Sequence, residues 1–445
     1  MRVVASAITV VVTVAGPAAP ARAHSSRPAP TAVTTVARPA TPARAHVSPR
    51  APYTVYWDEN EEEDFLRVPS GRTGQLIPPW DPNGQLCIVP DRSGRFVVGY
   101  NPTLASQNNP GSLKPLKEPA IGEALYDRRG RFIKTIFVPG PFALPGTTIG
   151  GDIPPDAADS GVFNDNGSMT GCAFDHNGNL FAVDLGTAQG AFPPPDDGRL
   201  IEWFGPTYNT FCIVDGPTAG GVGPHHVDGT GGLRQPGDLA IDPESGDLMV
   251  PEAGSPGIAI GGRVLRIARG SLPRSAADCS PDGLYPAARL RASTFVQGGA
   301  TYLPFPIAIA RDSTCRCWAI STTIGDPSVV WVHDDGTPVA GRSLPGVDIA
   351  HLGQDPNAAN PFGIAFAPDG TLYLVDIHIV CSAPLVNCGP ASKGGRVLRV
   401  TFSNGRPNPA QTVATGLDFP TSVTVCVRGH RDVCPAAPPR GHDSG

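Results

Sequence analysis

The 445-residue sequence lacks the short motifs that mark several common kinds of active site. It contains no GxSxG, GxxxxGK[ST], HExxH or CxxCH motif, and no dinucleotide-binding glycine fingerprint follows a predicted strand. It also lacks any CxxC pair, which argues against a zinc site built from its cysteines. We therefore expect no nucleotide cofactor, and any chemistry must come from side chains scattered along the chain.

The sequence also lacks an excess of positive charge and a second long apolar run. Lys and Arg number 34 against 40 Asp and Glu, so nucleic acid is not an expected partner. The apolar run Val3–Ala15 follows Arg2 and precedes a small-residue cleavage pattern at 21–23. This pattern predicts a signal peptide over residues 1–23 and a secreted or extracytoplasmic protein. The run is shorter than the roughly 20 residues of a membrane-spanning helix, so we expect no transmembrane anchor.

Glycine, proline and cysteine are abundant instead. The 53 Gly and 51 Pro residues make up almost a quarter of the chain, which disfavours long helices. Ten cysteines in an exported chain indicate disulfides, and the short loops favour Cys381–Cys388 and Cys426–Cys434. Cys315 and Cys317 are expected to be too close to bridge each other on an extended strand.

Composition also predicts the domain boundaries. Residues 24–52 are rich in Pro, Ala and Thr with almost no large apolar side chains, which predicts a disordered leader. The folded part is expected over 53–427, followed by a flexible tail over 428–445.

One pattern repeats within the folded part: an apolar strand, a turn, a second strand ending in a polar residue, and a Gly-Arg-led third strand. Three clear copies begin at Gly171, Gly237 and Gly363, for example "GDLAIDPESGDLMVPEAG…GRVLRIA". Looser copies begin at Leu86 and Ile307, and "FPTSVTV" supplies a further first strand. The equivalent first-strand positions are Cys87, Cys172, Asp238, Ile307, Ile364 and Val423.

Sheets of this kind are apolar on both faces and bury them by packing around an axis. The six starts predict an all-β, six-bladed β-propeller with four-stranded antiparallel blades. Little chain follows Phe419, whereas the strand candidates Tyr53–Trp57 and Phe65–Val68 precede the first copy. We therefore expect the N-terminal strands to join the C-terminal blade and close the ring.

The segments "TGCAFDHNGNLFAVD" and "PGDLAIDPESGDLMVPE", each followed by a Gly-Arg-led strand, resemble the NHL repeat of six-bladed propellers. They are also similar to the gluconolactonase/regucalcin and strictosidine-synthase-like propellers. The resemblance extends in patches from Gly84 to Val427 and implies the fold more than a function. The loops at 101–119, 186–197 and 378–393 are longer than in a plain NHL array.

In such a propeller, the loops that enter first strands and leave second strands meet on one face around the channel mouth. The ligand-binding candidates on this face are Asn101, Asn164, Asp165, Asp184, Glu252 and Asp376. The metal-binding candidates are His225, His226, Asp238, His351 and His378.

Two metal sets remain open. Histidines from separate blades would suit zinc with an open coordination position, an arrangement similar to that in peptidylglycine amidating-lyase propellers. An oxygen-only set of Asp184, Asp238, Glu252 and Asp376 would suit calcium, as the resemblance to lactonase-type propellers implies. The sequence therefore predicts at most one cofactor, a divalent metal that is either zinc or calcium.

A structural role is the alternative for each candidate. Asp184, Glu252 and Asp376 occupy a repeat position where an acid can bind nearby backbone N–H groups. Asp238 instead replaces an apolar residue near the axis, where a buried carboxylate needs a partner. The histidines could be exposed loop residues.

Two functions follow from these alternatives. The favoured one is a monomeric, exported propeller that binds a small molecule, a glycan or an exported protein on its loop-rich face. The other is a metal-dependent hydrolase or lyase that polarises an ester, lactone or similar carbonyl at the channel mouth.

Overall fold

The computed structural model describes part of the chain between Tyr53 and Cys434. The described residues are 53–57, 65–68, 72–75, 86–100, 122–129, 132–136, 169–184, 198–216, 233–253, 262–281, 283–298, 303, 305–323, 328–345, 359–383, 386–390, 394–417, 420–427 and 434. The chain divides into two units, 1–51 and 52–445, and all the described residues belong to the second. The predicted signal peptide and leader lie outside the described residues, as does the predicted tail apart from Cys434.

The described strands form four-stranded sheets in which chain neighbours pair antiparallel. The first sheet contains β4 (Leu86–Ile88), β5 (Phe96–Tyr100), β6 (Gly122–Tyr126) and β7 (Phe132–Ile136). The second contains β8 (Met169–Phe174), β9 (Leu180–Asp184), β10 (Arg199–Trp203) and β11 (Phe211–Asp215). The third contains β12 (Ala240–Ile241), β13 (Leu248–Glu252), β14 (Arg263–Ile267) and β15 (Ala292–Gln297).

The remaining sheets follow the same plan. The fourth contains β16 (Pro306–Asp312), β17 (Cys317–Thr322), β18 (Ser328–Val332) and β19 (Pro338–Pro345). The fifth contains β20 (Pro361–Phe366), β21 (Leu372–Asp376), β24 (Gly395–Val400) and β27 (Gln411–Leu417). The sixth is ordered β28 (Val423–Val427), β1 (Tyr53–Trp57), β2 (Phe65–Val68) and β3 (Arg72–Gln75).

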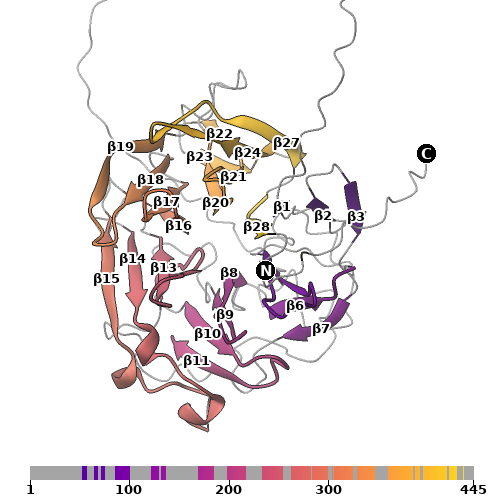
Figure 1. Cartoon of the computed structure of the whole chain (residues 1–445), viewed down its shortest axis with the longest axis vertical. Helices are drawn as coiled ribbons and strands as arrows, with labels where there is room; N and C mark the ends of the chain where they lie inside the picture. The colour runs from indigo at the N-terminus through magenta and orange to yellow at the C-terminus, as the bar shows by residue number, and fades with distance from the viewer. Residues whose placement is uncertain are drawn as a thin grey trace, which may run out of the picture. The chain divides into compact units, whose positions relative to one another are not determined.

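The sheets lie around a central axis with their first strands innermost, which confirms the predicted β-propeller fold (Figure 1). Along this inner ring, β4 contacts β8, β8 contacts β12, β12 contacts β16, β16 contacts β20, β20 contacts β28 and β28 contacts β4. β1 pairs with β28 from Tyr53 opposite Val427 to Trp57 opposite Val423, so the first and last described strands share one sheet.

The repeated glycines allow neighbouring first strands to approach closely. A Cβ atom on Gly171 would lie 2.4 Å from the Cα of Asp238 in the next sheet. A Cβ on Gly237 would lie 2.4 Å from the carbonyl oxygen of Ile307, and one on Gly363 would lie 2.6 Å from that of Thr421. The repeat therefore needs glycine because of crowding between sheets.

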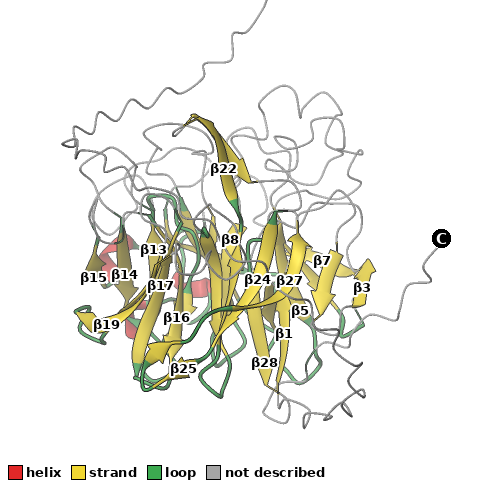
Figure 2. Ribbon diagram, turned by 90° about the horizontal axis from the view of Figure 1, so that it is seen from above, coloured by secondary structure: helices red, strands yellow, loops and turns green. Residues whose placement is uncertain are grey.

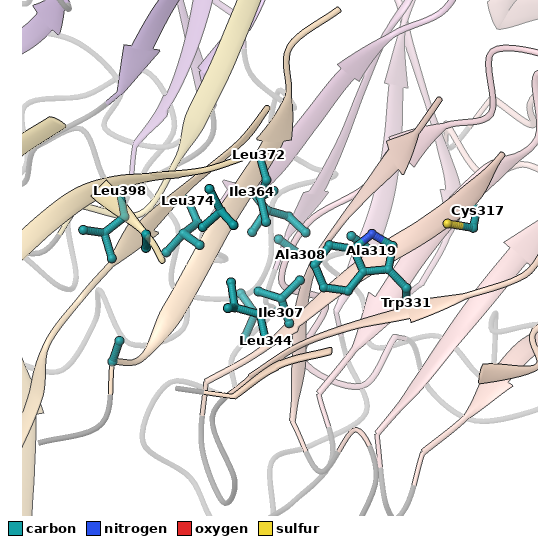
Figure 3. Packing of buried hydrophobic residues seen from close by; sticks show 14 of the residues in the cluster. Ile307, Ala308, Cys317, Ala319, Trp331, Leu344, Ile364, Leu372, Leu374 and Leu398 are labelled. Carbon is teal, nitrogen blue, oxygen red and sulfur yellow. The ribbon is translucent and has the colours of Figure 1, made fainter. Parts of the chain in front are cut away.

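The hydrophobic core lies between the faces of adjacent sheets. Figure 3 shows one such layer, in which Ile307 and Trp331 of the fourth sheet belong to the same buried cluster as Ile364 and Leu374 of the fifth. All four side chains are at least 95% buried. Burial of each aliphatic side chain of this kind contributes about 1.5–3 kcal/mol. The alternating apolar residues of the repeat thus hold the sheets together.

Several elements were not predicted from the sequence. β3 adds a strand to the sixth sheet, and the long connection after β21 contains the hairpin β22 (Ile379–Ala383) and β23 (Val386–Pro390). Figure 2 shows this hairpin projecting beyond the ends of the propeller strands. A smaller hairpin joins β25 (Phe402–Ser403) to β26 (Arg406–Pro407). The β14–β15 connection contains the 3₁₀ helices η2 (Arg269–Ser271), η3 (Ala276–Asp278) and η4 (Ala287–Arg289).

The disulfides agree only in part with the sequence prediction. Cys426–Cys434 is present, and Cys381 lies opposite Cys388 in the β22–β23 register. Cys87–Cys172 joins the first strands of the first and second sheets, and Cys212–Cys279 joins β11 to the residue after η3.

The prediction that Cys315 and Cys317 do not bridge each other was wrong, because the structure joins them. Cys315 lies in the turn before β17, and Arg316 has a left-handed φ of 53°. The extended-strand geometry assumed for this pair therefore does not apply.

No helix in the described ranges is long and apolar enough to span a membrane. The only described helices are the three short 3₁₀ turns of the β14–β15 connection. The four disulfides among the described residues are compatible with a protein that functions outside the cytoplasm.

Candidate functional site

The strand registers place two of the predicted site residues, Asp184 and Asp376, at one end of the sheets. Pro361 at the start of β20 lies opposite Asp376 at the end of β21, and Met169 at the start of β8 lies opposite Asp184 at the end of β9. We call this end the top face, and the opposite end, which carries the turns between first and second strands, the bottom face. The β22–β23 hairpin follows Asp376 and therefore leaves the sheets from the top face.

More than half of the predicted site residues cannot be placed there in detail. Those outside the described residues are Asn101, Asn164, Asp165, His225, His226 and His351. For Asp184 the structure describes the backbone, whose register partner is Arg199, but not the side chain. The described side chains of the predicted set are those of Asp238, Glu252, Asp376 and His378.

Asp376 is enclosed by donors from its own chain. Its carboxylate is fully buried; Oδ1 accepts hydrogen bonds from the backbone N–H groups of Asn360 at 2.8 Å and His378 at 3.0 Å. Oδ2 accepts from Nε of Arg396 at 2.9 Å and also pairs with Nη2 of that residue. The carboxylate therefore joins the loop before β20, the loop after β21 and the start of β24.

Glu252 makes the equivalent contacts in the third sheet. Its side chain is 1% exposed; Oε1 accepts from the backbone N–H of Arg234 at 2.7 Å, and Oε2 pairs with Nε of Arg263. Arg263 and Arg396 are the Arg residues of the repeated Gly-Arg motif. The repeat thus pairs the acid that ends the second strand with the Arg that begins the third, and the structural role considered for both acids is observed.

His378 lies directly beyond this cluster. Its backbone is left-handed, with φ of 49°, and its N–H donates to Asp376. Its side chain is partly buried, at the point where the chain turns from β21 into the β22 hairpin. The position agrees with the predicted top face.

Asp238 lies in the wall of the central channel. Its side chain is 5% exposed, and Oδ1 accepts a hydrogen bond from the adjacent backbone N–H of Leu239 at 2.7 Å. It precedes β12 and faces the chain at Gly171. The channel encloses a cavity of about 540 Å³, lined by the first strand or first-strand segment of every sheet. The lining also includes the charged side chains of Asp175 and Arg311 and the ring of His176 at the bottom ends of these strands, so the cavity extends from Asp238 towards the bottom face.

The described residues do not assemble either predicted metal set. Glu252 and Asp376 already pair with arginines, so they do not fit an oxygen-only calcium site. Within the described part of the chain, one group brings three potential ligand atoms together, namely Asp312, Cys315 and Cys317. Both cysteines are in a disulfide, and Asp312 pairs with Arg342, so this group does not fit a metal either.

A second cavity, of about 580 Å³, lies on the bottom face between the second and third sheets. It is lined by the turns at 175–179 and 245–248, by residues 269–274, and by Glu202 of β10. The sequence analysis did not predict this cavity, although the residue at one repeat position could have indicated it. Glu202 stands in the third strand of its repeat where the other clear copies have Arg266 and Arg399.

The sequence matches no known family model and no curated protein. Solved structures that are similar to this one share little sequence identity with the chain. A protein of unknown function from Bacteroides caccae is 11% identical, with 84% of this chain and 99% of that chain covered and a TM-score of 0.44.

The second similar structure is a gluconolactonase from Xanthomonas campestris, 12% identical, with 83% and 90% covered and a TM-score of 0.38. The third is the virginiamycin B lyase of Staphylococcus aureus, 11% identical, with 77% and 74% covered and a TM-score of 0.37. Such distant likenesses assign no activity, and the fold assignment rests on the strand pairing described above.

Proposed function

We propose that the protein is an exported, six-bladed propeller that binds a small polar molecule in its central channel. The six four-stranded sheets are its blades, and the β1–β28 pairing closes the ring. The observation that carries the proposal is the cavity of about 540 Å³, in which the buried carboxylate of Asp238 lies among apolar first-strand side chains, with Asp175, His176 and Arg311 towards the bottom face. Concave pockets that combine apolar walls with a few polar groups are typical of small-molecule sites.

The chemistry of the channel indicates the kind of ligand. Apolar first-strand side chains such as Ile309 and Ile364 would cover the body of the molecule. Asp238 would accept a hydrogen bond from a hydroxyl or amine group, because a buried carboxylate gains most from a donor. The proposal therefore favours a small molecule or the end of a glycan over a large protein surface.

The channel can be tested by filling it. Ala365 lines the cavity, and Ala365→Phe would occupy ligand space, whereas Ala277→Phe places the same side chain on an exposed 3₁₀ turn. Thermal-shift and calorimetric titrations of the mature chain would use glucose, maltose, glucosamine and choline as probes. We expect one of them to bind wild type and Ala277→Phe but not Ala365→Phe or Asp238→Ala. Equal binding by all four proteins, or binding of no probe at millimolar concentration, would contradict the proposal.

The metal-dependent hydrolase or lyase is the competing function. It predicts about one equivalent of zinc or calcium in dialysed protein and chelator-sensitive hydrolysis of p-nitrophenyl acetate or a lactone. The channel-binding proposal predicts metal-free protein whose stability is unchanged by chelator. The ion pairs that occupy Glu252 and Asp376 favour the binding function.

A further inference from the structure

The bottom-face cavity shares Asp175 and His176 with the channel cavity and is built by three parts of the chain. The turn before β9 and the turn before β13 form its walls, and residues 269–274 of the β14–β15 connection cover it. The same connection is fixed to the second sheet by Cys212–Cys279 and by hydrogen bonds between Ile213 and residues 283 and 285. At about 580 Å³ the cavity is in the size range of small-molecule sites.

Glu202 is a buried acid in this wall with one unused oxygen. Its side chain is 1% exposed, and Oε1 accepts a hydrogen bond from Nδ2 of Asn179 at 2.9 Å. Oε2 is buried and has no hydrogen-bond partner among the described residues. Burial, followed by the charges of Asp175 and Asp278, raises the pKa of Glu202 to about 8, although the Asn179 hydrogen bond opposes the shift. At neutral pH the carboxyl therefore carries a proton that needs an acceptor.

The repeat position of Glu202 is occupied by a different residue in the next sheet. In the third sheet Asp247 pairs with Arg266 at 2.7 Å. In the second sheet, Asn179 and Glu202 occupy the corresponding positions, so an ion pair is replaced by an amide and an acid. A protonated acid with a free donor has thus taken the place of a satisfied pair.

The other charged groups leave the cavity mouth cationic. The carboxylate of Asp175 accepts from its own turn, at the backbone N–H of Asn177 and at that of Asn179. The carboxylate of Asp247 is taken up by Arg266 and by the backbone N–H of Arg269.

Two exposed guanidinium groups remain at the mouth. Arg269 contacts the ring of His176, and the side chain of Arg274 has no partner among the described residues. Guanidinium groups bind carboxylate and phosphate through paired N–H donors. The mouth therefore favours an anionic group.

We propose that this cavity binds a small hydroxylated organic anion. Its carboxylate or phosphate would pair with Arg269 and Arg274, and one of its oxygens would accept the hydrogen bond of Glu202. The apolar side chains of Phe181 and Leu248 would cover its carbon skeleton. This site adjoins the proposed channel site at Asp175 and His176. Glu202, Arg269 and Arg274 line only the bottom-face cavity, so their variants test this proposal apart from the channel proposal.

The first experiment is calorimetric titration of the full mature chain at pH 7 with glucuronate, glucose 6-phosphate, inorganic phosphate and glucose. We expect glucuronate or glucose 6-phosphate to bind and glucose not to bind. Tighter binding of glucuronate would indicate a carboxylate ligand, and tighter binding of glucose 6-phosphate would indicate a phosphate ligand. Arg274→Ala should weaken binding at least tenfold, whereas Arg406→Ala, which removes an exposed arginine from β26, should leave it unchanged. Absence of binding by every anionic probe, or equal binding by both variants, would overturn the proposal.

The second experiment uses pH to test Glu202. Because the ligand needs the protonated acid, wild-type affinity should fall about tenfold between pH 7 and pH 9, through the pKa of about 8. Glu202→Gln keeps a neutral donor and should bind at pH 7 with little change between these pH values. The titratable and charged groups around Glu202 are Asp175, His176, Asp247, Arg269, Arg274, Asp278 and Tyr285. An unchanged pH dependence in Glu202→Gln would remove Glu202 from the site, and thermal unfolding checks that each variant is folded.

Discussion

Asp376→Asn tests whether the acid that ends the second strand stabilises the fold or serves as a ligand. The substitution keeps the shape of the side chain but removes the charge opposite Arg396, which is only 12% exposed. Loss of one member of a buried ion pair costs about 3–5 kcal/mol, because the remaining charge stays buried without compensation. We expect a loss near the lower end, about 3 kcal/mol, because Arg396 keeps some contact with water and the asparagine oxygen still accepts one hydrogen bond.

The assay is urea denaturation followed by tryptophan fluorescence, with Arg396→Gln and the double variant completing a double-mutant cycle. The double variant should lose less stability than the sum of the two single variants, because neither charge is then left alone. Asp335→Asn is the control, since Asp335 is exposed and its carboxylate accepts hydrogen bonds from Thr337 in its own turn. A wild-type unfolding midpoint for Asp376→Asn would refute the structural role, and loss of a bound ion in that variant would restore the metal hypothesis.

Three other perturbations follow from the structure. Because burial raises the pKa of Glu202 from 4.5 to about 8, the folded protein holds a proton that the unfolded chain releases, so wild-type stability should fall between pH 5 and pH 8. Thermal unfolding across this range should show no such fall in Glu202→Gln. Gly171→Ala should cost about 1–3 kcal/mol in urea denaturation because the added methyl group meets the next sheet, and Gly270→Ala, with room for a methyl group, should cost little. Replacing Cys87 and Cys172 by Ala should lower stability by about 4.6 kcal/mol, as loop entropy predicts for residues 85 apart, and a midpoint equal to wild type would exclude that effect.

The repeat in the sequence predicted most of the strand arrangement. The turn glycines and alternating apolar residues located the first strands, and they located Tyr53–Trp57 and Phe65–Val68 as the observed bounds of β1 and β2. These signals are local. Every sheet needs them for the same reason, because its first strand must approach the neighbouring sheet closely and its faces must pack against apolar neighbours. The same signals predict six blades, and six blades are what we propose for this protein.

The candidate site could be predicted less well. Repeat position correctly suggested a structural role for Glu252 and Asp376, but the Arg partners became evident only from the cross-strand register. The bottom-face cavity depends on how the β14–β15 connection folds over β10, and its short 3₁₀ turns have no periodic sequence pattern. Glu202 was visible only as an acid in a position that the other clear copies fill with Arg.

The pairing of β1 with β28 has a consequence for the order in which the chain is made. β1 is among the first folded residues to emerge, but the strand that pairs along its full length ends at Val427. Until that residue has been synthesised, one edge of β1 has no partner, and exposed strand edges attract other chains. The nascent protein must therefore keep one edge of its earliest described strand free until its last described strand has been made.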